Sequence, residues 1–365
     1  YITGGLDGLL TIDRQLLRSR QVVRWIGALP GVSDGIDIDD LFYFSFRRAG
    51  VGGVAVVDKQ QGQVVQFSGA TEPSSSLARY HHLLFVDQEY SGIKIFDIAS
   101  PARPRLLADW LDYRAQRMLV VNDFLISHAF STGLSVTDIS NLNSIHLIEQ
   151  IKTPRLLGMV AINQYLLCVA YDQGLLIYRV QKNGKIEEVS RLHPPFPAQQ
   201  FDQQVDIQVH ENLAYIANGR AGLMIVDVSN PQQPQLVSTI SVPGYTKGVR
   251  LYRDLVYLVT LRDGVHIVNV SKPAEPLFIG SVPLSRLSKF LLIGDGLLYF
   301  FQNASGISAI PLPHFAENVK LLSRHQLSVV MPAPSYPGRY NLLISNRHGT
   351  VNHSAVFDIY EESGL

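Results

Sequence analysis

The stretch that decides the fold is Gly222-Leu223-Met224-Ile225-Val226-Asp227-Val228-Ser229-Asn230-Pro231. A glycine precedes an apolar run, an aspartate stands five residues after the glycine, and a turn containing proline follows. The pattern recurs eight times, with glycines 39 to 48 residues apart at Gly8, Gly53, Gly92, Gly133, Gly174, Gly222, Gly264 and Gly306. A repeat of about 40–45 residues rich in strand formers predicts the blade of a β-propeller.

The sequence around this stretch predicts one complete blade. Four short apolar segments are separated by turn residues, at 205–209, 213–217, 223–228 and 236–240. Such a meander predicts four antiparallel strands, and the continuous apolar run at 223–228 predicts a strand buried on both faces. The glycine allows a positive φ at the hairpin. The aspartate can accept backbone N–H bonds in the following turn, so we interpret it as structural.

The number of copies predicts the number of blades. Eight copies over residues 1–325 predict an all-β propeller of eight four-stranded blades, and seven blades with the first copy packed outside is the alternative. Copy one contains only three strand-like segments. We therefore expect a strand from residues 326–365, either 328–331 or 340–345, to complete that blade and close the ring.

Two further copies carry a family resemblance. Residues 92–97 and 264–269 repeat the pattern of residues 222–227. This sequence pattern resembles the LVIVD-repeat family, and the resemblance extends over roughly residues 1–325. Copies three, six and seven match well, whereas Arg179 and Pro311 replace the aspartate in copies five and eight. The resemblance implies a propeller in an extracytoplasmic protein, secreted, periplasmic or on the cell surface. It implies no reaction.

The C-terminal segment carries a second, shorter resemblance. Gly338, Tyr340, Asn346, Gly349 and Phe357 hold the places of the last strands of a TIG-type immunoglobulin-like module. Some 35 residues match. The segment is either part of such a module or a set of extra propeller strands. Because the chain starts in mid-strand, we read it as a processed protein or a piece of a longer one.

Composition narrows the class of protein. The chain is 46% hydrophobic and 17% charged, with 31 basic and 31 acidic residues, which argues against binding to nucleic acid or an anionic membrane. It has no apolar run long enough to cross a membrane directly. The single cysteine, Cys168, lies in an apolar run and is predicted to be a buried, inert thiol.

The sequence offers little for metal or cofactor chemistry. Residues 34–40 contain four aspartates, but alternating side chains of a strand point to opposite faces, so we expect a strand and an Asp39-Asp40 turn rather than a calcium site. His81-His82 falls in a predicted turn, and no zinc-type spacing occurs. No nucleotide-binding or hydrolase motif is present. We therefore expect no metal and no cofactor.

One face of a propeller carries the loops between second and third strands together with the blade-to-blade connections. Arginine and tyrosine, the residue types that contribute most to interfaces, recur there. The predicted ligand-binding residues are Arg47, Arg48, Tyr90, Tyr113, Arg114, Arg117, Phe130, Arg155, Tyr171, Phe201, Arg220, Tyr245 and Arg262.

These residues predict a non-enzymatic binding or spacer module that engages a protein or a glycan through the loop face. One alternative is a structural repeat in a surface or fibre assembly, which a flat apolar patch would favour. Another is a lyase or hydrolase acting in the central funnel, with Asp34, Asp172 and Asp263 as candidate groups. A ring of inner-strand carboxylates and arginines facing one cavity would favour the enzyme.

Overall fold

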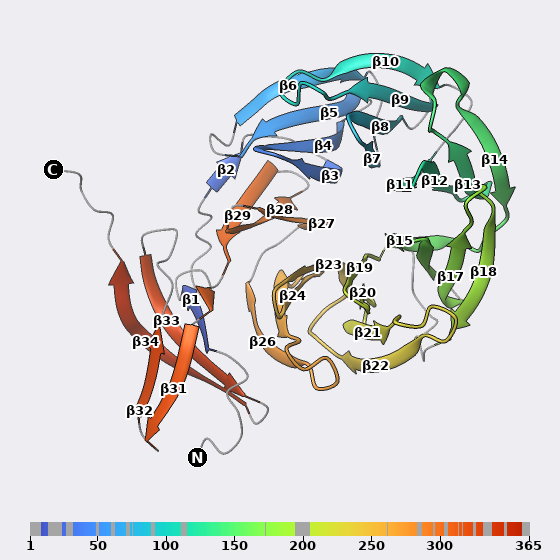
Figure 1. Ribbon diagram of the computed structural model, residues 1–365. Helices are drawn as coiled ribbons and strands as arrows, with labels where there is room; N and C mark the ends of the chain where they lie inside the picture. Colours follow the sequence, from blue (N-terminus) through green and yellow to red (C-terminus); the bar gives the residue numbers. More distant parts are fainter. Residues whose placement is uncertain are drawn as a thin grey trace.

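A computed structural model shows a ring of β-sheets with further strands beside it (Figure 1). It describes residues 9–13, 24–26, 32–48, 51–59, 63–70, 74, 76–88, 92–110, 115–171, 173–193, 205–260, 262–282, 287–294, 296–302, 306–312, 314–315, 317–323, 326–330, 338–346 and 349–359.

Six blades are four-stranded antiparallel meanders of consecutive strands. Blades 1 and 2 contain β3 (Val32–Ile38), β4 (Leu41–Arg48), β5 (Val51–Asp58), β6 (Gln63–Ala70), β7 (Leu77–Tyr80), β8 (Leu83–Gln88), β9 (Gly92–Asp97) and β10 (Arg105–Trp110). Blades 3 and 4 contain β11 (Arg117–Val121), β12 (Phe124–Ala129), β13 (Gly133–Asp138), β14 (His146–Ile151), β15 (Leu156–Ile162), β16 (Tyr165–Ala170), β17 (Gly174–Val180) and β18 (Ile186–Leu192). Blades 5 and 6 contain β19 (Ile207–His210), β20 (Leu213–Ala217), β21 (Leu223–Asp227), β22 (Gln235–Ile240), β23 (Thr246–Tyr252), β24 (Leu255–Thr260), β25 (Val265–Asn269) and β26 (Leu277–Val282).

The prediction of four-stranded antiparallel blades is confirmed, but the predicted number of blades is wrong. Copies two to seven form the six blades, in place of the expected eight or the alternative seven. Strand β2 of copy one instead joins the strands of copy eight in one composite sheet, called here the closing sheet. It contains β27 (Leu287–Gly294), β28 (Leu297–Gln302), β29 (Gly306–Pro311) and β2 (Arg24–Ile26), in the order β2-β29-β28-β27.

The closing sheet completes the ring. Its strand β27 lies between β23 of blade 6 and β3 of blade 1. β2 pairs antiparallel with β29, with Trp25 opposite Ser308, and so covers the edge that β29 would otherwise expose. The strand that closes the ring therefore comes from the N-terminal part of the chain rather than from residues 326–365.

The remaining strands form two other sheets. β1 (Leu9–Asp13) lies between β30 (His314–Phe315) and β33 (Gly338–Asn346), and β34 (Gly349–Ile359) follows β33. β31 (Glu317–Ser323) pairs with β32 (Gln326–Val330). In Figure 1 these strands lie beside the closing sheet. The resemblance of this segment to a TIG-type module stays a prediction.

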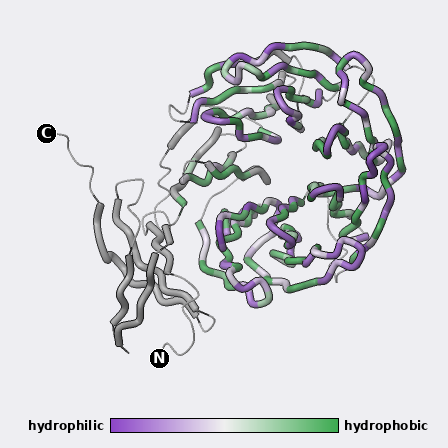
Figure 2. Tube along the Cα trace, viewed as in Figure 1, coloured by the Kyte–Doolittle hydropathy of each residue, from purple (hydrophilic) through white to green (hydrophobic). Residues whose placement is uncertain are grey.

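The hydrophobic core is divided among the contacts between neighbouring sheets. Leu167 and Ile177 of blade 4 pack with Ala214 and Met224 of blade 5, and every other pair of neighbours that the structure describes repeats this arrangement. Figure 2 accordingly shows hydrophobic stretches distributed all around the ring. Second and third strands are buried because they lie between two blades, while the fourth strand β10 is mostly exposed. Each such large apolar side chain contributes about 1.5–3 kcal/mol on burial.

The repeated aspartate caps a turn, as predicted. Asp227 Oδ1 accepts the Ser229 N–H at 2.8 Å, and Asp138 Oδ1 accepts the Ser140 N–H at the same distance. In copy seven the amide oxygen of Asn269 makes the equivalent bond to Ser271. The Ser229 N–H bond lowers the pKa of the Asp227 carboxyl by stabilising its charged form. For Asp138 the hydrogen bond from the Ser140 hydroxyl, at 2.6 Å, lowers the pKa most, and the Ser140 N–H adds to the effect.

Cys168 is buried, as expected, in the core between blades 3 and 4. Burial raises the pKa of its thiol and keeps it neutral. The described residues contain no helix with the length and hydrophobicity that a bilayer crossing requires.

Candidate functional site

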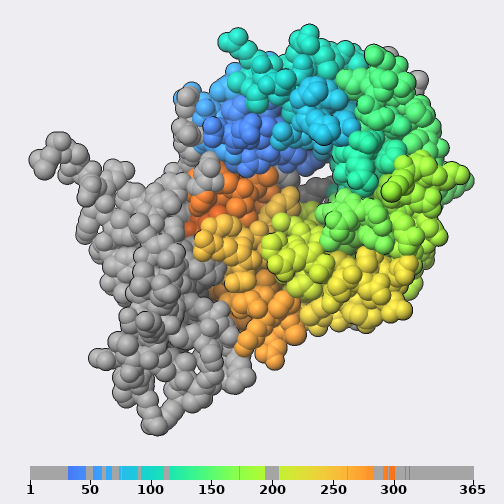
Figure 3. Space-filling view, viewed as in Figure 1, coloured from blue at the N-terminus to red at the C-terminus, as the bar shows by residue number. Residues whose placement is uncertain are grey.

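The topology gathers two kinds of segment at one edge of every blade. In a four-stranded meander the turn between strands two and three, and the connection to the next blade, lie at the same end of the strands. The turn between strands three and four lies at the opposite end. We call the first edge the loop face. Figure 3 shows that the ring is hollowed at its centre.

The structure places seven of the thirteen predicted binding residues with their side chains. They are Arg117, Phe130, Arg155, Tyr171, Arg220, Tyr245 and Arg262. Arg47 and Arg48 end strand β4, with side chains outside the described part. Tyr90, Tyr113, Arg114 and Phe201 lie outside the described residues, as does Asp172.

Arg155 joins two aromatic side chains of neighbouring blades. Its guanidinium lies 4.9 Å from the ring centroid of Phe130, on the β12–β13 turn, and 5.9 Å from that of Tyr171, after β16. The backbone holds the group in place, because the Tyr171 N–H donates to the Arg155 carbonyl at 2.9 Å. Gln116 supports Phe130 by accepting its N–H at 3.2 Å. A guanidinium over an aromatic face is a favourable cation–π arrangement.

Tyr245 and Arg220 continue this surface on blade 5. Gly219 and Thr246 exchange two backbone hydrogen bonds, of 2.9 and 3.1 Å, which hold the β20–β21 turn against the connection that leads to β23. Burial raises the pKa of Tyr245 to about 12, against the opposing effect of the Arg220 charge, and Tyr171 adds a smaller increase. Tyr171 and Tyr245 also pack on the same core between blades 4 and 5. We call Phe130, Arg155, Tyr171, Arg220 and Tyr245 the loop-face cluster.

His128 lies directly beneath this cluster. Its ring meets the Phe130 ring edge-on at 5.7 Å, and it lies opposite Arg117 in the β11–β12 register. The side chain is 1% exposed, and neither ring nitrogen has a hydrogen-bond partner among the described residues. Burial, with a smaller contribution from the Arg117 charge, lowers the pKa of His128 to about 4. The imidazole is therefore neutral at neutral pH.

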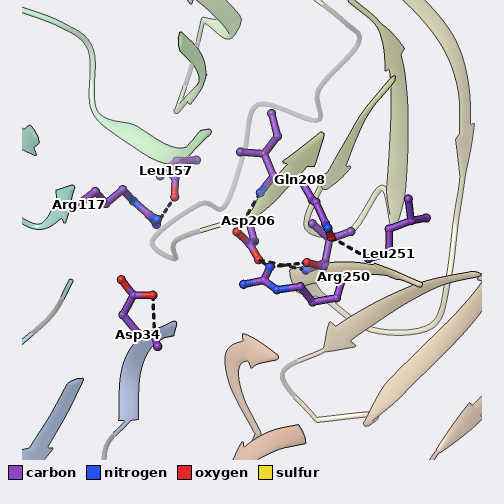
Figure 4. A network of polar contacts seen from close by, with 10 residues as sticks. Asp34, Arg117, Leu157, Asp206, Gln208, Arg250 and Leu251 are labelled. Carbon is purple, nitrogen blue, oxygen red and sulfur yellow. Dashed lines mark hydrogen bonds and ion pairs between the residues drawn. The ribbon is translucent and has the colours of Figure 1, made fainter. Parts of the chain in front are cut away.

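Charged residues of the inner strands lie around the centre of the ring (Figure 4). Arg117 of β11 donates to the carbonyl of Leu157 on the next blade. Burial lowers the pKa of Arg117, while the charges of Asp206 and Asp34 oppose that shift. Arg250 of β23 forms an ion pair with Asp206 at 2.5 Å.

The carboxylates of this group bond to the backbone of the next blade. Asp34 Oδ2 accepts the Leu77 N–H at 2.9 Å, and Asp206 Oδ2 accepts the Val249 N–H at 3.4 Å. The two aspartates occupy the same place in their repeats, and each reaches about one repeat ahead. Gln208, two residues after Asp206, does the same by accepting the Leu251 N–H at 2.7 Å. These side chains therefore connect adjacent inner strands.

Sequence reasoning missed Asp206, Arg250 and His128. The first two were detectable in principle, because Asp206 aligns with Asp34 when the inner strands are superimposed. His128 had no such signal. Its burial depends on Phe130 and on the neighbouring blade, so only the tertiary structure identifies it.

The aspartates of residues 34–40 turn to different partners, as the alternation of strand side chains predicts. Asp34 bonds within the ring, whereas Asp37 pairs with Lys59 at 2.5 Å. Asp39 and Asp40 form a turn, as do His81 and His82. Among the described residues, no group of three His, Cys, Asp or Glu side chains is placed to hold a metal ion.

Comparison with known proteins supports the repeat and the fold. Residues 116–153, 204–242 and 243–283 match the family described as LVIVD repeat, which covers copies four, six and seven. The predicted match of copies six and seven is confirmed, whereas copy three is not among the matched stretches. No curated protein matches the chain in sequence.

Solved structures of other propellers resemble the chain at low identity. The RRP9 WD40 repeats are 11% identical with a TM-score of 0.62, covering 80% of this chain and 97% of that one. The β-propeller domain of Cps50 (Swd1) from Myceliophteria thermophila is 11% identical with a TM-score of 0.60, covering 79% and 98%. BamB from Moraxella catarrhalis is 12% identical with a TM-score of 0.55, covering 80% and 99%. Identities this low show the fold alone.

Proposed function

We propose that this chain is a non-enzymatic binding module that takes a protein partner on its loop face, at the loop-face cluster. A propeller of LVIVD repeats fits a binding or structural role. The observation that carries the proposal is the continuity of the cluster. Three consecutive blades and their connections contribute Phe130, Arg155, Tyr171, Arg220 and Tyr245 to one surface.

The state of the channel residues argues for binding rather than catalysis. Inner-strand carboxylates and arginines do lie around the centre, which is the arrangement that would favour an enzyme. However, Asp34 accepts bonds from the backbone of Gly35 and Leu77 and from the Ser76 hydroxyl. Asp206 is held by Arg250 and by the next strand. A general acid or base must reach the proton that it transfers, and these contacts already occupy both carboxylates.

The composition of the cluster favours a protein over a glycan. Phe130 is 47% exposed beside the Arg155 guanidinium, so an apolar anchor and a charge are adjacent. Tyrosine and arginine are over-represented among residues that contribute most to protein interfaces.

A photo-crosslinking amino acid placed at position 130 tests the proposal. In extracts we expect a protein to crosslink from position 130 and not from position 103, an exposed arginine in the β9–β10 turn at the opposite edge. The crosslinked protein, purified, should bind the wild-type chain and lose affinity for Arg220→Glu. A glycan array is probed with the same chain in parallel. If the chain binds only sugars, the ligand is a glycan rather than a protein. Equal crosslinking from both positions would contradict the proposal.

A second candidate function is assembly, and the outer strands favour it. β6 exposes Val65 and Phe67 at 45% and 58%, and β10 of the adjacent blade exposes Leu106 and Leu107 at 45% and 39%. Unpaired outer strands with apolar side chains are typical contact sites between chains. Light scattering across a concentration series would test this. Self-association that Phe67→Ser abolishes would favour a structural assembly, and a monomer throughout would reject it.

A further inference from the structure

We propose that the loop-face cluster selects acidic peptide segments, with a carboxylate of the partner binding Arg220 and an adjacent apolar side chain packing on Phe130. The inference rests on the proposed function and names the chemistry of the partner. It follows from the charge balance of the loop face and from the placement of each charge.

Basic groups outnumber acidic ones on the described part of the loop face. Arg220 and Arg262 lie on the turns between the second and third strands of blades 5 and 6, Arg155 and Lys247 lie at connections between blades, and Asp263 is the acidic residue described among them. The Asp263 carboxylate lies against Gly244. Its Oδ2 is so close that a side chain at position 244 would bring a Cβ within 2.1 Å of it. Deeper in the channel, Asp34 and Asp206 offset Arg117 and Arg250. Among the described residues of the loop face, positive charges therefore outnumber negative ones.

Two of these arginines are presented to solvent. Arg220 and Arg262 are exposed, and neither forms an ion pair with another described residue. Their guanidinium groups keep the fork of donors that carboxylates accept in a bidentate manner. Arg105 and Arg191, by contrast, form ion pairs with Asp97 and Glu188. An acidic ligand at the loop face therefore meets arginines that no other described side chain has neutralised.

The apolar part of the cluster distinguishes a peptide from a polyanion. Phe130 offers an exposed ring in the same cluster as the exposed Arg220, so one ligand can combine a carboxylate with an apolar side chain. A peptide supplies both within two or three residues. A uronate polymer supplies repeated carboxylates without an apolar side chain and would engage the arginines alone.

Selection from a displayed library of random dodecapeptides tests the inference. We expect enriched peptides to combine Asp or Glu with a neighbouring Phe, Leu or Ile. Synthetic peptides should then bind the wild type by fluorescence anisotropy, with affinity that falls as salt shortens the screening length. Arg220→Glu should lower that affinity about tenfold or more, and Arg220→Lys should retain most of it. Arg103→Glu, at the opposite edge, is the matched control and should leave affinity unchanged.

The outcomes separate the inference from the function on which it rests. If enriched peptides are neutral or basic but are still lost with Phe130→Ala, the acidic preference is wrong and the binding surface stands. If acidic peptides bind equally to wild type, Phe130→Ala and Arg220→Glu, both proposals fall. If polygalacturonate binds through Arg220 and no peptide does, the ligand is a polyanion and the peptide assignment is overturned. Matching thermal midpoints of wild type and variants exclude misfolding as the cause.

Discussion

At the scale of single residues, the repeated acid of the turn has a measurable role. Asp227→Ala removes the acceptor of the Ser229 N–H and should lower the free energy of unfolding by about 1 kcal/mol in urea titrations. Asp227→Asn should retain most of this stability, because Asn269 makes the same bond in the next repeat. Equal stability of the alanine variant and the wild type would show that the cap contributes nothing.

His128 should make the stability of the ring depend on pH. Its pKa is about 4 in the folded chain against 6.5 for the free group, so between these values the unfolded chain binds the proton and the folded chain does not. Stability therefore falls as pH decreases from 6.5 to 4, by up to about 3 kcal/mol. Urea unfolding of wild type and His128→Leu across this range would measure the effect. The leucine variant should show a shallower slope, and identical slopes would exclude His128 as its source.

At the scale of elements, the hairpin glycines determine whether the third strand can form. Gly222 has a φ of +84°, and a Cβ there would approach the Ile240 carbonyl oxygen to 2.2 Å. Gly222→Ala should therefore cost about 1–3 kcal/mol. Gly280 is a matched control, because it lies within strand β26 with nothing within 4 Å of the same substitution. Gly280→Ala should change thermal stability little, and an equal loss in both variants would refute the geometric explanation.

The side-chain hydrogen bonds between neighbouring inner strands also act at the scale of elements. Asp206, Asp34 and Gln208 each bond to the backbone of the following blade, so they stabilise blade order around the centre rather than one strand. This explains why charged side chains can occupy the narrowest part of a propeller. Asp206 is paired with Arg250, and Asp34 accepts hydrogen bonds from backbone N–H groups and from the Ser76 hydroxyl.

At the scale of the whole molecule, the ring depends on β2. A chain lacking residues 1–26 loses the strand that covers β29 and should unfold at lower temperature and aggregate more readily. A chain lacking only residues 1–13 loses β1 and keeps β2, so it separates ring closure from the loss of the neighbouring sheet. Calorimetry with light scattering would compare the two. Similar midpoints for both truncations would mean that β2 is not the closing element.

The repeat predicts which residues of the candidate site lie on the loop face, but it does not predict which of them are in contact. Phe130, Arg155, Tyr171, Arg220 and Tyr245 could be predicted because a repeat places every such position on one face. Their mutual contacts could not, since they depend on how adjacent blades rotate against one another. His128 was missed for the same reason, whereas Asp206 could have been found because it aligns with Asp34 in the repeat. The extracytoplasmic setting stays a prediction from the family resemblance.

By itself the sequence determined the repeat unit. The glycine, the apolar run and the capping aspartate act within about ten residues, so local sterics and hydrogen bonding are sufficient to specify the hairpin and the turn. The tertiary structure alone decided the number of blades and the manner of closure. Copy one has the strands of a blade in its sequence, yet β1 and β2 pair with different sheets. Closure is a property of the whole ring, because a strand pairs with whichever exposed edge the packing of all the blades brings within hydrogen-bonding distance.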